Sequence, residues 1–210
     1  MTVLRVDASI QGPRSASSEL ADIVLEELTT ARPDVPVVQR HLGAEPLPAG
    51  AWADAIAGKF APAEDRSPAQ ADALALAETL ANELRDADSA VLALPLYNFG
   101  VSQHAKAWFD LAMAGGEHGE RFLEGKPVVL VTTRGGAYGA GTPREGWDHN
   151  TDYLRRVLAD IWGADLTVVE REFTLVGVNP ALDDFKDLAA QFKDAAHAAA
   201  AAAGKALAAA

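Results

Sequence analysis

The chain has 210 residues, of which 49% are hydrophobic, and we therefore expect one core and a single domain over residues 1–210. Its formal net charge of −12 argues against a nucleic-acid partner, because the surface field would repel phosphate groups. The absence of cysteine excludes disulfides, thiolate metal sites and a cysteine nucleophile.

Met1 and Thr2 lead into the first predicted strand, Val3–Asp7, where an export signal would instead place basic and then apolar residues. No apolar run approaches the roughly 20 residues that are needed to cross a bilayer. Together these features predict a soluble, cytoplasmic protein that has no membrane partner.

Short apolar runs alternate along the chain with longer amphipathic stretches, a pattern typical of βαβ units in a parallel sheet. The third and fourth runs are apolar at every position from Val91 to Leu94 and from Val128 to Val131. Such continuous hydrophobicity predicts strands that helices cover on both faces. The five predicted strands are Val3–Asp7, Pro36–His41, Ala90–Pro95, Pro127–Thr133 and Leu166–Glu170.

Helices are predicted from apolar periodicity and capping residues. They cover Ser17–Thr30, Ser67–Arg85, Val101–Met113, a segment from Asp148 or Asn150 to Trp162, and Ala181–Ala203. Residues 45–67 read as an irregular excursion with room for a short helix at Ala51–Ile56. This alternation predicts an α/β fold, a doubly wound five-stranded parallel sheet with helices on both faces. The common strand orders are the dinucleotide-binding order and the flavodoxin-like order 2-1-3-4-5, and both bind ligands at the carboxyl ends of the strands.

The loop after the first strand is rich in hydroxyl groups. It runs from Ser9 to Ser18 and lacks the Gly-x-Gly-x-x-Gly pattern of a dinucleotide-binding turn. Ser15 and Ser17 stand at the start of a helix, where free N–H groups and the helix dipole favour an anion. Serines at this place are often only helix caps, but the number of hydroxyl groups in this long loop favours a phosphate site.

Two further loops carry residue types that suit a planar ligand. The loop at Pro95–Gly100 holds two aromatic rings, which can stack, and an asparagine, which can both donate and accept hydrogen bonds. After the fourth strand come Arg134, Gly135 and Gly136, and paired glycines let backbone N–H groups approach a ligand closely. Packing within the first loop and a plain turn in the second are the alternative interpretations.

These three loops resemble the FMN-contacting segments of the bacterial FMN-dependent azoreductases and NADH:quinone oxidoreductases, in the same order and at similar spacing. The resemblance also includes Leu74–Leu84 and Lys106–Asp110, and it extends from the first strand to about Gly163. It implies a flavodoxin-like fold and FMN as the cofactor. The residues that it implies for FMN contact are Ser9, Ser15, Ala16, Ser17, Pro95, Leu96, Tyr97, Asn98, Phe99, Thr133, Arg134, Gly135 and Gly136.

In that family the serine loop holds the FMN phosphate and the other two loops contact the isoalloxazine ring. The resemblance implies hydride transfer from NAD(P)H through flavin N5 to a quinone or to an azo or other aromatic acceptor, by a ping-pong mechanism. No catalytic side chain is strictly required, because the cofactor carries the redox chemistry. The family works as a homodimer, and we expect Trp108, Phe109 and Trp162 to form an exposed aromatic set that supports one.

The sequence departs from the family at two places. Gly115–Gly125 is shorter than the family's aromatic-bearing loop, which helps to wall the acceptor pocket, so we expect a more open flavin face. Tyr138 stands where relatives often have a histidine, and it is a candidate proton donor or stacking residue. The histidines form no ligand spacing with acidic residues, so no metal is expected.

Two other interpretations fit the same residues. A flavodoxin-type FMN electron carrier would suit the acidic surface, because such carriers dock on basic partners. A non-catalytic flavin-binding protein, or a relative that has lost the flavin, would share the fold but oxidise no NAD(P)H.

Overall fold

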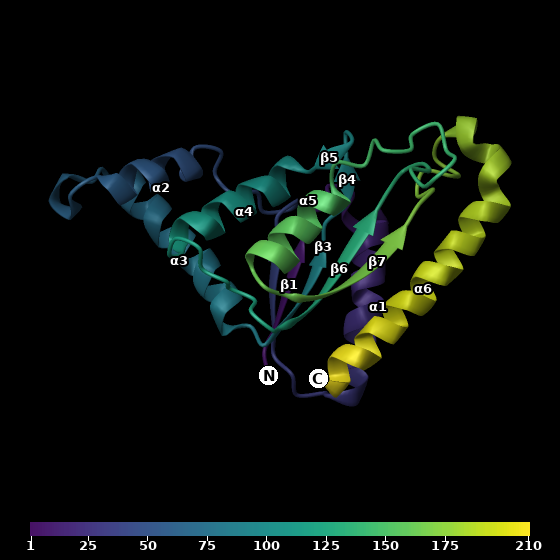
Figure 1. Ribbon diagram of the computed structural model, residues 1–210, viewed down its shortest axis with the longest axis horizontal. Helices are drawn as coiled ribbons and strands as arrows, with labels where there is room; N and C mark the ends of the chain where they lie inside the picture. Colours follow the sequence, from purple (N-terminus) through teal and green to yellow (C-terminus); the bar gives the residue numbers. More distant parts are fainter.

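The computed structural model describes all 210 residues and contains a five-stranded parallel sheet in the order β2-β1-β3-β6-β7 (Figure 1). Without the short hairpin formed by β4 and β5, this is the order 2-1-3-4-5, so the predicted flavodoxin-like topology is confirmed. The strands are β1 (Val3–Asp7), β2 (Val37–His41), β3 (Ser89–Ala93), β4 (Leu96–Tyr97), β5 (Gly100–Val101), β6 (Pro127–Thr133) and β7 (Asp165–Arg171).

Helices cover both faces of the sheet, with α1 and α6 packed together on one face and α3, α4 and α5 on the other (Figure 1). The helix α2 packs outside α3 and α4 and reaches one end of the molecule. The helices are α1 (Ala16–Ala31), α2 (Ala51–Phe60), α3 (Pro68–Asp86), α4 (Gln103–Gly115), α5 (Thr151–Arg155) and α6 (Lys186–Ala209). Short 3-10 segments lie at Gly12–Arg14, Ala63–Asp65 and Pro180–Phe185, and a π-helical turn at Arg156–Ile161 continues α5.

Alternation along the buried strands divides the core into two parts. On β3, Ala90 and Leu92 point towards α3 and α4, whereas Val91 and Ala93 point towards α1 and α6. Strand β6 repeats this division, because successive side chains point to opposite faces of a sheet. The continuous apolar runs therefore supply two cores at once, as the sequence predicts.

Residues 45–67 are more regular than predicted. The helix α2 continues to Phe60, and Ser67 then caps α3 through a capping box that it forms with Gln70. In this box Ser67 accepts from the Gln70 N–H at 3.2 Å. The alanine-rich sequence of α2 gives few large apolar positions, which is why its periodicity is weak as a helix signal.

The predicted exposed aromatic set is wrong. Trp108, Phe109 and Trp162 are each at most 1% exposed, and they pack against one another with ring centroids 5.0–5.7 Å apart. The π-helical turn brings Trp162 into this cluster, because the Trp162 N–H donates to Val157 O five residues earlier, at 2.9 Å. These rings fill the core between α4, α5 and the sheet and are not available to a partner.

None of the helices combines the length and the apolar character that a membrane span requires.

Candidate functional site

The carboxyl ends of β1, β3 and β6 open on a cavity of about 430 Å³, which we call the serine-lined cavity. Its volume lies in the range of small-molecule and cofactor sites. The residues from the three predicted loops that line it are Ser9, Gln11, Arg14, Ser15, Ala16, Ser17, Pro95, Leu96, Tyr97, Asn98, Thr133, Gly135, Tyr138 and Arg144. Thr174, Leu175 and Val178 line it from the chain beyond β7.

The start of α1 forms one wall. Ser15 is the N-cap of the helix and accepts from the Ser18 N–H at 3.1 Å, while its hydroxyl lies 3.1 Å from that of the buried Ser17. The N–H groups of Ala16 and Ser17 have no acceptor within the protein. Free N–H groups at a helix start, beside a hydroxyl and with the helix dipole behind them, make a site for an anion.

The loop after β3 is held to this wall by the hydroxyl group of Tyr97. It lies 3.1 Å from Ser9 Oγ and accepts from the Ile10 N–H at 3.2 Å. Asn98 and Phe99, with φ of 47° and 70°, form a two-residue turn between β4 and β5, and both residues adopt the left-handed region as in a type I′ turn. A bulky residue in this region is strained, and such strain is typical of ligand sites. The turn places Asn98 in the cavity wall.

The loop after β6 forms the third wall and is strapped to the chain beyond β7. The Leu175 N–H donates to Gly135 O at 3.1 Å, and the Phe173 N–H donates to Gly136 O at 3.2 Å. A Cβ at Gly135 would lie 2.6 Å from the Leu175 side chain, so a larger residue here would require that side chain to move. The N–H groups of both glycines have no acceptor in the protein, although Gly136 is buried. A buried donor without a partner is costly unless a ligand accepts from it.

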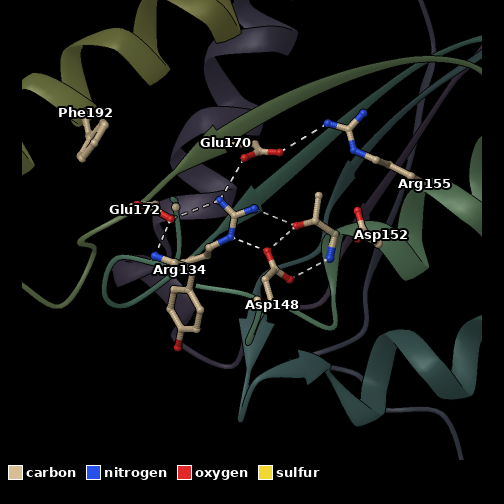
Figure 2. Close-up of a pocket in the computed structure, with 11 residues that line it drawn as sticks. Arg134, Asp148, Asp152, Arg155, Glu170, Glu172 and Phe192 are labelled. Carbon is tan, nitrogen blue, oxygen red and sulfur yellow. Dashed lines mark hydrogen bonds and ion pairs between the residues drawn. The ribbon is translucent and has the colours of Figure 1, made fainter. Parts of the chain in front are cut away.

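Three of the predicted site residues do not line the cavity: Phe99, Arg134 and Gly136. Phe99 is 41% exposed and packs edge-on against Trp147 at 5.6 Å, and its ring is tilted against that of Tyr138 at 6.4 Å. Gly136 lies one residue beyond the lining, against the guanidinium of Arg144. The Arg134 side chain points away into a second hollow, so a contact between its guanidinium and FMN is not what the structure provides (Figure 2).

This second hollow, the arginine cleft, has a volume of about 580 Å³. The Arg134 guanidinium donates to Asp148 at 2.6 Å, to Thr151 Oγ1 at 2.9 Å and to Glu170 at 3.0 Å, as Figure 2 shows. Glu172 lies 3.7 Å away. Burial alone would lower the pKa of the Arg134 guanidinium, but the charges of Glu170 and Asp148 raise it overall. Arg134 is therefore a fully paired structural cation.

Sequence reasoning missed the strap beyond β7, which supplies Thr174, Leu175 and Val178 to the cavity. Its signal was present, because the carboxyl end of a fifth parallel strand must lie at the same edge of the sheet as the other four. Turn-forming residues, Gly177 and Asn179-Pro180, lie in the segment that follows that strand.

The shortened segment Gly115–Gly125 lies at the amino ends of the strands, whereas the cavity lies at their carboxyl ends. It leads into Pro127, the first residue of β6, whereas the cavity begins at Thr133, the last. Phe122 in this segment is buried against Trp162 at 5.4 Å. Within one chain this segment therefore does not reach the cavity, and its length does not decide how open the cavity is. No group of three or more His, Asp and Glu side chains gathers where it could hold a metal ion.

Comparison with known proteins assigns this architecture. Residues 1–203 match the family described as having a flavodoxin-like fold. The FMN-dependent NADH:quinone oxidoreductase of Frankia alni is 39% identical, with 89% of this chain and 90% of that protein covered. The enzyme of the same name from Frankia casuarinae is also 39% identical, with 94% and 96% covered. This chain belongs to the FMN-dependent NADH:quinone oxidoreductase family.

A solved structure of a family relative agrees. The crystal structure of the azoreductase from Bacillus anthracis str. Sterne has a TM-score of 0.78 at 25% identity, and 98% of this chain and 99% of that chain are covered. The family predicted from the sequence is confirmed, and with it the oxidoreductase class and FMN as the family's cofactor.

The serine-lined cavity suits FMN. One wall offers hydroxyl and N–H donors to a phosphate, and another offers the free N–H group of Gly135. Because β3 lies between β1 and β6, these two walls stand two strand spacings apart, roughly 10 Å, with Asn98 between them. A ligand with an anionic end and a flat polar ring would satisfy both walls.

Proposed function

We propose that this family member oxidises NAD(P)H and reduces quinones, and azo or other aromatic acceptors, in ping-pong order at one FMN bound in the serine-lined cavity. The observation that carries the proposal is the pair of walls whose backbone N–H groups have no acceptor in the protein. Residues 1–210 act in this proposal as one FMN-binding domain, since α6 completes the core on one face of the sheet.

In this proposal Ser15 and Ser17, with the N–H groups at the start of α1, hold the phosphate against the acidic surface. Asn98 and the N–H group of Gly135 bind the polar edge of the ring, where they stabilise negative charge. Bound FMN supplies a carrier that accepts two electrons from the donor and passes them to the acceptor. The protein's part is position and electrostatics, and no side chain has to take part in bond making.

Arg144 supports a donor that carries phosphate groups. It lines the cavity, lies 5.6 Å above the Tyr138 ring and approaches the Tyr138 hydroxyl at 3.4 Å, and it forms no ion pair with a carboxylate. In a chain with a net charge of −12, an arginine side chain without a carboxylate partner is available to bind an anion. One FMN in one cavity supports the ping-pong order, because donor and acceptor would then meet the same cofactor in turn.

The test is steady-state oxidation of NADH with a quinone acceptor by the purified, FMN-loaded protein. Initial rates measured at several fixed concentrations of each substrate should give parallel double-reciprocal lines. Intersecting lines would show that both substrates bind together, and the ping-pong order would be wrong. A protein that binds FMN but shows no quinone-dependent turnover would instead be an electron carrier, which the acidic surface also suits. A protein that takes up no FMN would overturn both.

A homodimer is also part of this proposal, on grounds other than the aromatic set expected from the sequence. Trp52, Ile56 and Phe60 recur at four-residue intervals along α2, so they lie on one face of the helix. Trp52 is 50% exposed and Phe60 is 85% exposed, which is unusual for rings of this size. Sedimentation should show a dimer that Phe60→Asp converts to a monomer. A wild-type monomer at micromolar concentration with full activity would contradict it.

The cytoplasmic location stays a prediction. It is supported by the proposed donor, since NAD(P)H is a metabolite of the cell interior, and by a sequence without cysteine.

A further inference from the structure

The side chain of Arg134 joins segments that are distant in the sequence. Its backbone leaves β6, where the N–H donates to Arg171 O at 2.8 Å. Its guanidinium reaches Asp148 and Thr151 at the start of α5, and Glu170 on β7. With a side chain only 8% exposed, Arg134 is the centre of this cluster (Figure 2).

The 135–147 loop, which lies between Arg134 and Asp148, has no helix or strand. Its internal hydrogen bonds are isolated turns, such as the Glu145 N–H to Thr142 O at 3.1 Å. Nevertheless it carries Tyr138 and Arg144 to the serine-lined cavity. A loop of this length keeps one conformation only if its ends are fixed, because the entropy of the open chain favours many others.

Both ends of the loop are fixed at the Arg134 cluster. At the far end, Asp148 accepts from Arg134 Nε at 2.6 Å and from the Thr151 N–H at 2.9 Å. At the near end, Glu172 lies beside the guanidinium and accepts from the Tyr138 N–H at 2.8 Å. A guanidinium suits this position because its planar fork donates in several directions at once, which an ammonium group does not reproduce.

We propose that Arg134 is a positioning residue that clamps the 135–147 loop and thereby holds Tyr138 and Arg144 in the cavity wall. The clamp acts through Asp148 and Glu172 and makes no contact with the ligand. The consequence for binding rests on the proposed function, since it assumes that FMN occupies the cavity. The fixed loop itself does not depend on that assumption.

The test compares two substitutions, each of which removes one carboxylate charge beside the Arg134 guanidinium. Asp148→Asn detaches the far end of the loop, whereas Glu170→Gln removes a partner on β7 and leaves the loop attached. The first readout is the rate of tryptic cleavage after Arg144 in the FMN-free protein, followed by mass spectrometry. The second readout is FMN affinity, from the quenching of flavin fluorescence on binding.

We expect Asp148→Asn to raise the cleavage rate about tenfold and to weaken FMN binding about fivefold, because the loop opens locally without global unfolding. Glu170→Gln should change the cleavage rate and the FMN affinity by less than about twofold each, because Glu170 is a partly exposed partner. Equal effects in both variants would assign the result to the charge balance of the cluster and overturn the clamp. No change in Asp148→Asn would overturn it too.

A second variant covers the case in which Asp148→Asn does not fold. Arg134→Lys keeps the charge but cannot hold Asp148, Thr151 and Glu170 together, so it should raise cleavage after Arg144 while thermal unfolding stays cooperative. Cleavage at the wild-type rate would contradict the clamp. If the wild-type protein binds no FMN, the proposed function fails, but the cleavage comparison in the FMN-free protein still decides whether the loop is clamped.

Discussion

Two neighbouring hollows at the carboxyl edge of the sheet differ in how their polar groups are paired. In the arginine cleft the guanidinium of Arg134 has a partner on every side, and Asp148 accepts from both protein backbone and side chains. In the serine-lined cavity the N–H groups of Ala16, Ser17 and Gly135 have none. The cavity is smaller than the cleft, so size does not identify the ligand site.

The difference shows what each hollow contributes. Groups that satisfy one another fix the backbone and leave little for a ligand to bind. Donors that stay unpaired in a walled cavity bear a desolvation cost that only a ligand or water can offset. We therefore propose that the cleft acts as scaffold and the cavity as binding site, and the two meet in the chain at Arg134-Gly135. Substitutions in the two hollows should separate stability from binding.

The largest effect on stability is expected from Arg134→Met. It removes the cation from three carboxylates, of which Asp148 and Glu172 are only 14% exposed. A buried carboxylate that loses its cation costs several kcal/mol, and we expect the free energy of unfolding to fall by about 3 kcal/mol. Urea unfolding of the FMN-free protein measures it. The control is Arg156→Met, whose pair with Asp160 is exposed and should contribute less than about 1 kcal/mol. Similar losses of unfolding free energy in both variants would show that the Arg134 cluster stabilises the fold no more than an exposed ion pair does.

The second prediction separates two neighbouring serines. Ser17→Ala should weaken FMN binding by about 1–3 kcal/mol, since a charge-assisted hydrogen bond is lost, and should leave stability nearly unchanged. Ser15→Ala should weaken FMN binding as well, but it also removes the N-cap of α1, at a cost of about 1 kcal/mol in unfolding free energy. Fluorescence titration and urea unfolding give the two quantities. Unchanged affinity in the double variant would place the phosphate elsewhere.

Much of the fold follows from local sequence, but the contacts and burial of individual side chains do not. The run from Val91 to Leu94 specifies a buried central strand by itself, because only a sheet covered on both faces buries every position. The loops at Ser9–Ser18 and Pro95–Gly100 could be assigned to one cavity because parallel strands end at one edge.

The sequence pattern does not show which side chains pair with each other across the fold. Arg134 meets Asp148 and Glu170, which are 14 and 36 residues away, and nothing near Arg134 in the sequence distinguishes them from other acidic residues. Trp108 and Phe109 are adjacent on α4, yet both are buried, because α4 packs between α3 and the aromatic core around Trp162. Helical periodicity alone would place one of two adjacent positions closer to solvent.

The arginine cleft should also give the stability a dependence on acid. Burial would raise the pKa of Asp148, but hydrogen bonds from Thr151 and Asn150 and the charge of Arg134 lower it below its ordinary value of 3.8. A depressed pKa contributes stability that is fully present above pH 3.8 and is lost as the pH falls through the lower, folded value. The unfolding free energy measured from pH 5 to pH 2.5 should fall less steeply in Asp148→Asn. Identical slopes would show that other carboxylates govern acid unfolding.

The smallest effect is expected at Tyr138, where the contrast between scaffold and site is finest. Its backbone N–H belongs to the arginine cleft through Glu172, whereas its ring lines the serine-lined cavity beneath Arg144. Tyr138→Phe keeps the backbone contact, the ring and the cation above it, and removes only a hydroxyl group that Arg144 approaches at 3.4 Å. If that hydroxyl helps to protonate the product, kcat with quinones should fall about threefold, at the low end of general acid catalysis because water is an alternative donor. KM for NADH should not change, since the charge of Arg144 remains. An unchanged kcat would make Tyr138 a stacking residue, and a raised KM without a change in kcat would assign the hydroxyl to holding Arg144 in place.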